Sequence, residues 1–514
     1  MPKQAAPIPQ AVPAIAPPAS SAPSVAPGGE AITVTHFAIT GNTVFDTATL
    51  ESQISQYQGQ ALTLAELYKV ANLLTRFYQD HGYGLARVTV PEQKFEAGRV
   101  ELLVIEGRIG QVHVEGNTDT HTAVILHSAA AAQPGAVFTN RAAERAVLLV
   151  NDLPGVQAKG VLVPGSSFGT TDLVLNVQEI PYQARGSIDD YGRPATGRWR
   201  VNASASINSL TGHGDQLTAG ITHAAGNLLN FGNLAYVVPA GPSGGSLALG
   251  YDRAIYHVGS GAFSKLDIGG ASSDASVIYQ YPLLRTTDQN LFWGLGVTHT
   301  SSYSDAGAQR ISDGSINLLQ ASVYYTRAHQ DGSYYTLNGQ FFTNGKYNDG
   351  SLNKAGIANS NGEKARLMLG GSYVMPFQSR WRFIAMGGMQ WSPDPLVDND
   401  KYSLGGPYSV RGFLSAEQRG DSGLYASAEV QRNLWPAMGM SLGAFLDSGR
   451  VWDQSTAAVP GHSLTLSSTG LDLTVIPANS RWSARIQWAY AIGGYRPSDG
   501  NNGGHVWATL AASF

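Results

Sequence analysis

The chain ends in Val506-Trp507-Ala508-Thr509-Leu510-Ala511-Ala512-Ser513-Phe514, and this stretch decides how the long C-terminal region folds. Every second residue from Val506 to Phe514 is apolar. Side chains alternate between the two faces of a β-strand, so this spacing places the apolar ones on a single face. The stretch therefore predicts a strand with one apolar face that runs to the last residue.

The same alternation recurs throughout residues 181–514. It is found in Leu291–Val297, Tyr335–Phe341, Leu424–Val430 and Trp482–Tyr490. Stretches rich in Gly, Asn, Asp and Ser, such as Ser312–Ser315, separate the alternating segments and are expected to be loops. A soluble β-sandwich alternates in the same way, so periodicity alone leaves both folds open. The region is too long for one sandwich, but it fits sixteen strands of a membrane barrel at about twenty residues per strand and connection.

The composition favours the barrel. Charged residues make up 14% of the chain, against about 25% in ordinary globular proteins. No apolar run reaches the roughly 18 residues of a transmembrane helix, so a membrane-spanning chain of this kind must close into a barrel. A net charge of −4 argues against a nucleic-acid partner. Since there are no cysteines, disulfides and thiolate metal sites are excluded.

An internal repeat organises the region before the barrel. Residues 37–43 are echoed by residues 112–118, and in both copies a short alternating strand ends at Gly-Asn, a pair suited to a left-handed turn. Apolar residues at helical spacing follow each turn, and two further strands complete each copy. The pattern predicts two tandem β-α-α-β-β modules, over residues 31–108 and 109–180.

The first thirty residues have a composition of their own. Residues 1–30 contain eight Pro and eight Ala and few large apolar side chains, so we expect a flexible tail. A basic stretch followed by an apolar run, as in a signal peptide, is not visible there. Because export would require one, we expect the sequence to be a mature or recombinant form.

Short motifs in the modules carry a family resemblance. The first module contains His81-Gly82-Tyr83, Val90-Pro91-Glu92-Gln93, Gly98-Arg99-Val100 and Ile105-Glu106-Gly107. These resemble the first POTRA domain of two-partner secretion transporters, the TpsB family, and Pro164-Gly165 resembles the end of the second. The alternative is a pair of small α+β packing modules of unknown purpose.

The barrel region continues this resemblance. Val410-Arg411-Gly412-Phe413 resembles the conserved tip of a hairpin that folds back into the lumen, expected around residues 402–420. Phe445-Leu446-Asp447-Ser448-Gly449 resembles the barrel-wall motif that receives it. Asp189-Asp190-Tyr191-Gly192 looks like the first barrel hairpin, although Asp190 replaces the usual Asn. The terminal Phe514 resembles the C-terminal signal read by the outer-membrane assembly machinery.

By this resemblance, Arg411 and Asp447 pair inside the barrel. The chemistry agrees, because a guanidinium offers a planar fork of donors that one carboxylate can accept bidentately. Gly405-Gly406 and Gly412 are expected to provide the positive φ angles of a tight hairpin tip. The alternative is a surface arginine in a Gly-rich loop, whose ion pair would contribute about 1 kcal/mol or less.

Catalytic motifs were also considered. Gly241-Pro242-Ser243-Gly244-Gly245 fits the nucleophile-elbow pattern, but it lies between alternating strands rather than between a strand and a helix. Gly420-Asp421-Ser422-Gly423 is similar to a serine-protease nucleophile sequence, but Leu424 begins a strand at once. The histidines lack the spacing of a zinc pair, and no phosphate loop is present. We therefore expect neither an enzyme nor a cofactor or metal site.

The resemblance implies an outer-membrane translocator with its POTRA domains in the periplasm and a barrel over residues 181–514. Its expected partner is a large exoprotein with an N-terminal secretion domain, of the adhesin, haemolysin or contact-dependent toxin type, which is exported unfolded. Outer-membrane lipids and, during biogenesis, the barrel-assembly machinery are further expected partners, and the barrel is expected to be monomeric. Many family members carry a plug helix before the first POTRA domain. Residues 1–30 are too rich in Pro to form it, so it is absent or was lost with the start of the natural chain.

Two other functions remain alternatives. A barrel-assembly factor of the same superfamily would share the hairpin motif, but such factors generally carry more than two POTRA domains. A passive porin or surface adhesin would not need the tandem modules. Export of a partner protein therefore remains the leading hypothesis.

Overall fold

The computed structural model describes residues 31–241, 243–261, 264–344, 347–349, 364–396, 400–454, 461–501 and 503–514. The predicted tail over residues 1–30 lies outside these described residues. The chain divides after Glu179 into two compact units. The first unit contains the two modules and the second contains the barrel.

The first module packs two helices against a three-stranded sheet. Its sheet has the order β2-β5-β4, with β2 parallel and β4 antiparallel to the central strand β5. The elements are β1 (Ile32–Thr33), β2 (His36–Thr40), α1 (Thr47–Ile54), β3 (Ala61–Leu62), α2 (Leu64–Asp80), β4 (Arg87–Thr89) and β5 (Arg99–Ile105). Thr63 and Glu66 form a capping box that begins α2. The helix ends at Asp80, before Gly82 with its φ of +90°.

The second module repeats this arrangement. Its sheet has the order β6-β8-β7, with β6 parallel and β7 antiparallel to β8. The elements are β6 (Arg108–Glu115), α3 (Thr122–Ser128), α4 (Asn140–Asn151), β7 (Val156–Pro164) and β8 (Thr170–Glu179). Each module has its own buried apolar core, which includes Leu67 and Leu74 in the first and Val147 and Leu175 in the second.

The repeated Gly-Asn turn is built in the same way in both modules. Gly41 and Gly116 have φ angles of +82° and +86°. A Cβ on either one would meet a carbonyl of the central strand, at 2.3 Å from Val104 O and 2.5 Å from Val177 O respectively. Both positions therefore require glycine, because of the backbone angle and because of the close approach.

A glutamate at the end of each central strand secures the turn. Glu106 accepts hydrogen bonds from the backbone N–H groups of Thr43 and Val44. Glu179 accepts them from three consecutive N–H groups, those of residues 118–120, at 2.6 to 2.9 Å. Burial raises the pKa of Glu179, but these hydrogen bonds, led by that from Asp119, outweigh it and lower its pKa to about 2.

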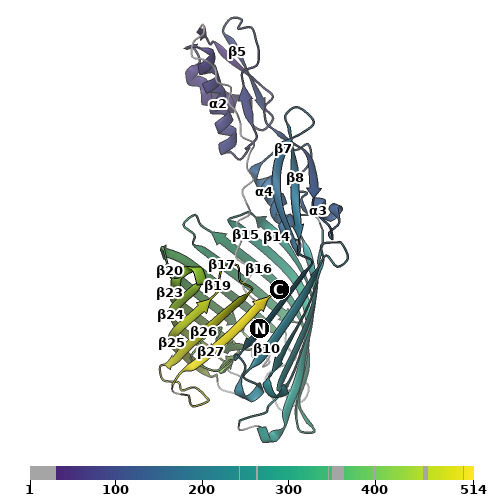
Figure 1. Ribbon diagram of the computed structural model, residues 1–514, viewed down its shortest axis with the longest axis vertical. Helices are drawn as coiled ribbons and strands as arrows, with labels where there is room; N and C mark the ends of the chain where they lie inside the picture. Colours follow the sequence, from purple (N-terminus) through teal and green to yellow (C-terminus); the bar gives the residue numbers. More distant parts are fainter. Residues whose placement is uncertain are drawn as a thin grey trace. The chain divides into compact units, whose positions relative to one another are not determined.

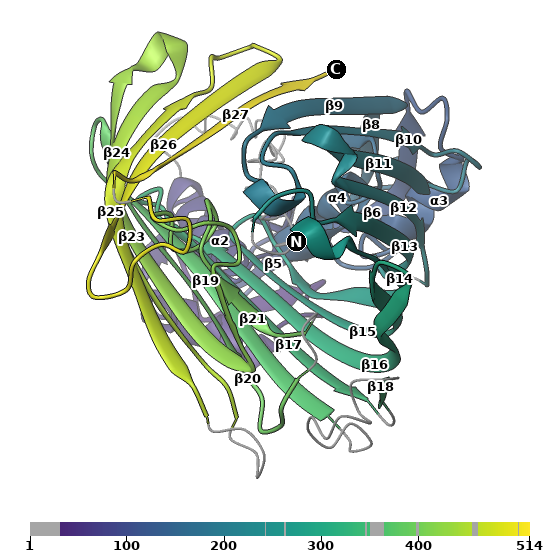
Figure 2. The same ribbon diagram turned by 90° about the horizontal axis from the view of Figure 1, so that it is seen from below.

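The second unit is a closed antiparallel barrel (Figures 1 and 2). It has sixteen strands when β17 and the short β18, which both pair with β16, are counted as one. The strands are β9 (Tyr182–Asp189), β10 (Arg200–Asn208), β11 (Gln216–Ala224), β12 (Leu229–Pro239), β13 (Ser246–His257), β14 (Ile268–Arg285), β15 (Gln289–Ala306), β16 (Gln309–Ala328), β17 (Tyr334–Asn344), β18 (Tyr347–Asp349), β19 (Lys364–Gln378), β20 (Trp381–Trp391), β23 (Ser422–Trp435), β24 (Met440–Trp452), β25 (Ser463–Val475), β26 (Trp482–Ile492) and β27 (His505–Ser513). The last strand pairs with the first and closes the barrel.

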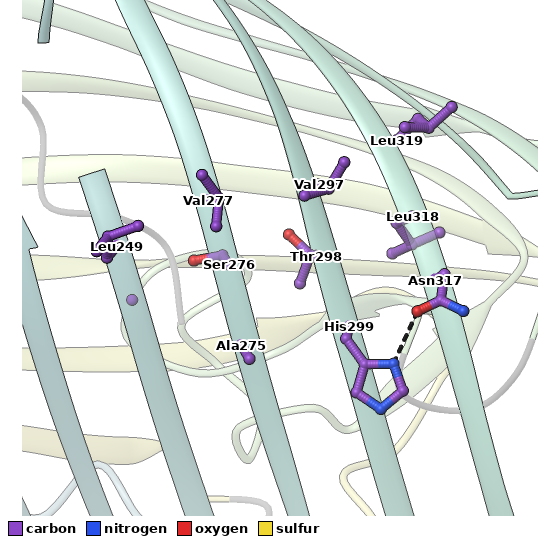
Figure 3. A pocket seen from close by; sticks show the side chains of 11 residues that line it. Leu249, Ala275, Ser276, Val277, Val297, Thr298, His299, Asn317, Leu318 and Leu319 are labelled. Atoms are coloured by element: carbon purple, nitrogen blue, oxygen red, sulfur yellow. Dashed lines mark hydrogen bonds between the residues drawn. The ribbon is translucent and has the colours of Figure 1, made fainter. Parts of the chain in front are cut away.

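The two faces of the wall have different chemistry. On β26, Trp488 and Tyr490 are exposed on the outer face, whereas Gln487 is completely buried on the lumen side. A hollow in the outer face between β13 and β16 is lined mainly by aliphatic side chains, including Val277, Val297 and Leu319 (Figure 3). The outer face thus has the apolar character of a surface that contacts lipid. Within the described residues, none of the helices has the length and apolar character needed to cross a bilayer.

One predicted loop is part of a strand. Ser312–Ser315 lies inside β16, and its backbone pairs with residues 301–304 of β15. The prediction was wrong because Ser, Asp and Gly were taken as turn residues, whereas pairing across the long strands β15 and β16 overrides this local preference.

Candidate functional site

A hairpin between β20 and β23 lies against the inner face of the barrel. Its two short strands, β21 (Tyr402–Leu404) and β22 (Gln418–Gly420), pair antiparallel. Gly405 and Gly406 follow β21 with φ angles of +103° and +94°, as expected from the sequence. This double glycine turns the chain toward the tip, which carries Val410-Arg411-Gly412-Phe413.

Gly412 serves a different purpose from the one expected. It is not among the residues with positive φ, so the tip does not need glycine there for its backbone angle. Instead, a Cβ on Gly412 would lie 2.6 Å from the Cβ of Ser468 and 2.8 Å from the backbone nitrogen of Ala491. Glycine is required because the hairpin backbone touches the wall at this point.

Arg411 makes a bidentate contact with Asp447 on β24. Its Nε and Nη2 donate to Oδ2 and Oδ1 of Asp447 at 2.9 and 2.7 Å, and its backbone N–H donates to Oδ2 at 3.1 Å. The carboxylate also accepts from the hydroxyls of Ser427 and Ser468, at 2.7 and 3.1 Å. Arg411 is 3% exposed and Asp447 is not exposed at all. The pair is therefore fully hydrogen-bonded in a site removed from solvent.

The ring of Phe445 packs against the face of the same guanidinium. The Cζ atom of Arg411 lies 3.2 Å from the centroid of the Phe445 ring, the geometry of a cation–π contact. Phe445 and Asp447 are two residues apart on β24, so both side chains point into the lumen. The strand thus presents a ring and a carboxylate to the same arginine.

The remaining motif residues shape the surroundings. Val410 and Phe413 are completely buried in a small apolar cluster with Leu404 of the hairpin and the wall residues Val451 and Leu466. A Cβ on Gly449 would lie 2.8 Å from the Leu404 side chain, so glycine there makes room for the base of the hairpin. Phe514, the predicted assembly signal, directly follows β27 and is not part of this cluster. It is 71% exposed and pairs through its backbone with Ala184.

Sequence reasoning missed two acidic residues of this site. Glu429 on β23 accepts from Nη1 of Arg411 at 2.9 Å and is 2% exposed. Asp472 on β25 lies 3.5 Å from the same Nη1 and is also paired with Arg485 on β26. Both acids occupy lumen-facing positions between apolar, outward-facing neighbours. A charged residue at such a position was the available signal.

The arrangement is therefore an extended buried network rather than one ion pair. Removing one partner from such a network leaves a buried charge without compensation, which typically costs about 3–5 kcal/mol. The chemistry of these groups fits structural anchoring of the hairpin tip to the barrel wall. Among the described residues, no group of His, Asp or Glu side chains is arranged to hold a metal ion.

A known protein family matches this chain. Residues 169–473, more than half of the chain, match the family described as haemolysin secretion/activation protein ShlB/FhaC/HecB. The chain belongs to this family. Residues 32–107 match the POTRA domain of the ShlB type. The predicted two-partner secretion transporter is confirmed, and so are its outer-membrane location, its periplasmic POTRA region and the fold class of POTRA domains followed by a sixteen-stranded barrel.

Several relatives align along most of the chain. The outer membrane transporter CdiB of Escherichia coli is 25% identical over 485 residues, which cover 90% of this chain and 80% of the relative. The heme/hemopexin transporter protein HuxB of Haemophilus influenzae strain 86-028NP is 24% identical, with 83% and 78% covered. The hemolysin transporter protein ShlB of Serratia marcescens is 23% identical, with 88% and 83% covered.

Solved structures show the same fold. The structure of CdiB from Escherichia coli superposes with a TM-score of 0.75 at 20% identity, covering 96% of this chain and 93% of that one. CdiB from Acinetobacter baumannii gives 0.68 at 17% identity, with 95% and 91% covered. A BamA structure from Haemophilus ducreyi that lacks POTRA domains 1–3 gives a lower score of 0.54 at 16% identity. Family membership and the relatives together favour secretion over the barrel-assembly alternative.

Proposed function

We propose that this transporter recognises a large exoprotein through its two modules and passes it, unfolded, through a barrel whose lumen is controlled by the Arg411 hairpin. The observation that carries the proposal is the buried anchoring of the hairpin tip to Asp447 and Glu429. A loop that merely lined the lumen would not need a desolvated ion-pair network. A movable obstruction needs a defined resting position, and such a network provides one.

The modules contribute an edge for substrate recognition. The strand β7 (Val156–Pro164) lies at the end of its sheet and, among the described residues, pairs only with β8. It is longer than the edge strand β4 (Arg87–Thr89) of the first module. An extended substrate segment adding beside β7 would gain main-chain hydrogen bonds without requiring one particular sequence. The proposal keeps the module bounds predicted from the sequence, residues 31–108 and 109–180.

The cargo class comes from the relatives. By their names, they transport heme/hemopexin or hemolysin partners, and CdiB is an outer membrane transporter. For this chain we infer an exoprotein with an N-terminal secretion domain, of the adhesin, haemolysin or contact-dependent toxin type. The chain acts as a conduit without catalysis, and folding of the cargo outside the cell supplies the driving force. Outer-membrane lipids surround the monomeric barrel, and the assembly machinery reads the end at Phe514.

Binding by the modules tests the proposal directly. Residues 31–180, which cover both modules, are expected to bind the secretion domain of the exoprotein encoded beside this gene. The measurement is calorimetry at low salt, with an unrelated β-helical fragment as the control ligand. A substitution of Gly160 on β7 by Pro should weaken binding. Gly160 lies two residues after Ala158, whose N–H and C=O bond to Asn151 on the side away from β8, so Pro at this position removes a backbone donor from the open edge. Equal binding of both ligands would contradict recognition by the modules.

A further inference from the structure

The closing seam of the barrel is unlike its other strand pairs. The first strand β9 pairs with β10 along Tyr182–Asp189, but it pairs with the last strand β27 only along Arg185–Asp189. On its other side, β27 pairs with β26 from His505 onward. Among the described residues, the part of β27 before Thr509 therefore pairs with β26 but not with β9.

Side chains take the place of the missing ladder. Asp190 donates its N–H to Ala508 O at 3.2 Å and accepts the N–H of Ala508 at Oδ1, at 2.8 Å. Arg198 donates to Val506 O at 3.3 Å while paired with Asp190 at 3.0 Å. Asp190 is the residue at which this chain departs from the family pattern, and its carboxylate is used here as a seam contact.

The hairpin tip lies across the same part of the seam. Trp507 of β27 is 2% exposed and donates its indole N–H to the backbone carbonyl of Arg411 at 2.7 Å. On the opposite side, Ser415 of the hairpin donates to the carbonyl of Tyr191, just after β9, at 2.8 Å. The Tyr191 ring also packs edge-on against Trp507, with centroids 6.1 Å apart. The hairpin thus contacts the last strand β27 and the segment that directly follows the first strand β9.

We propose that Trp507, Tyr191 and Ser415 form a second, uncharged anchor for the hairpin, and that this anchor couples the position of the hairpin to closure of the β9–β27 seam. The charged anchor on β23–β25 fixes the hairpin to a continuous part of the wall. The uncharged anchor fixes it to the part with the shortest ladder. Displacing the hairpin therefore removes the hydrogen bonds that it makes to both sides of the seam. By the same coupling, a more stable seam stabilises the hairpin in its position against the wall.

Hydrogen exchange of the full chain in lipid nanodiscs tests the first direction of this coupling. Trp507→Phe keeps an aromatic ring but removes the donor to Arg411. Since one hydrogen bond is lost, exchange of the Asp190 and Ala508 amides should accelerate about two- to tenfold. Amides of β13–β15 should keep their rates, which also shows that the variant barrel is folded. Trp488→Phe, on the exposed outer face of β26, is the matched control and should change neither region.

A disulfide tests the opposite direction. The backbones of Ala184 and Phe514 exchange both hydrogen bonds. Ser187 and Ala511 lie three residues further along the two strands, so they form a non-hydrogen-bonded pair. The Cα atoms of such a pair are about 4.5 Å apart, a distance that a disulfide can bridge. The chain has no cysteines of its own. In S187C/A511C, oxidation should slow exchange of the hairpin amide of Gly406, which donates to Phe413 O, and reduction should restore it.

The control disulfide is S206C/T218C on β10 and β11, where the two hydroxyls are 2.9 Å apart. It should leave hairpin exchange unchanged. Unchanged seam exchange in Trp507→Phe, acceleration of all wall strands alike, or an equal effect of both disulfides would each overturn the proposal. The measurement needs no cargo, so its failure is separate from failure of the proposed secretion function.

Discussion

Two carboxylates, Glu179 and Asp447, hold two turns in this molecule, and they do so by different means. Glu179 secures the turn at residues 116–120 with three backbone N–H groups and the hydroxyl of Thr118. Asp447 secures the hairpin tip with an arginine, two hydroxyls and a single N–H. Glu179 remains partly open to solvent, whereas Asp447 has no exposed surface. The comparison indicates that neutral donors suffice near water, while a fully desolvated carboxylate is paired with an opposite charge.

The largest effect is expected from breaking the charged anchor. Arg411→Ala leaves Asp447 and Glu429 buried without their cation, which should cost about 3–5 kcal/mol locally and release the hairpin. Secretion of the exoprotein should be lost while a heat-modifiable barrel remains in the membrane. Arg450→Ala, on the same wall strand as Asp447 but exposed, is the control and should secrete normally. Normal secretion by Arg411→Ala would refute anchoring as a functional requirement.

A double-mutant cycle measures how strongly Arg411 and Asp447 depend on each other, and its expected effect is somewhat smaller. Asp447→Ala removes the bidentate partner, and once it is gone the loss of Arg411 should matter much less. The two substitutions should therefore be non-additive by about 0.5–3 kcal/mol in thermal or denaturant stability of the barrel. Strict additivity would show that the two groups do not depend on each other, despite their contact.

A smaller effect is expected at Glu179, which holds the turn of the second module. Glu179→Gln keeps the size of the side chain but replaces charge-assisted hydrogen bonds with weaker neutral ones, at a cost of about 1–2 kcal/mol. Chemical unfolding of residues 31–180, followed by circular dichroism, measures it. Glu115→Gln, an exposed residue at the end of β6, should be neutral. If both variants unfold alike, the turn does not depend on the Glu179 charge.

The pH dependence of the same fragment gives the smallest and most specific signal. The folded-state pKa of Glu179 is about 2, below its value of about 4.3 in an unfolded chain. Its contribution to stability is therefore complete above about pH 4.3 and is lost as the pH falls toward 2. Glu179→Gln should flatten this part of the stability profile. An unchanged acid profile in the variant would assign the effect to other carboxylates.

The sequence was sufficient for the architecture because the deciding signals are local. Alternation with a period of two marks strands such as Trp482–Ile492, and the Gly-Asn turns mark the repeated modules. The same local reasoning was wrong at Ser312–Ser315, where strand pairing overrides turn propensity. It also assigned Gly412 to a positive-φ turn, whereas the structure shows a close approach to Ser468.

Only part of the candidate site could be predicted from the sequence. The Arg411 and Asp447 motifs stood out because their short patterns are distinctive. Glu429 and Asp472 did not, since their partnership with Arg411 depends on which strands are neighbours in the wall. Trp507 was read as one position in a terminal strand, and its hydrogen bond to Arg411 joins segments far apart in sequence. Such contacts become visible only when the register of the barrel is known.

The position of Glu179 also has a mechanical meaning. It is the last residue of β8, the central strand of the second module, and the chain continues from it into the barrel unit. If the modules hold cargo as proposed, a cargo pulled outward would put tension on the chain at this junction. Tension there would act along β8, which is hydrogen-bonded to β6 and β7 on both sides, so yielding would require both ladders to shear together. The second module is thus joined to the barrel unit through the strand of its sheet that is hydrogen-bonded on both sides.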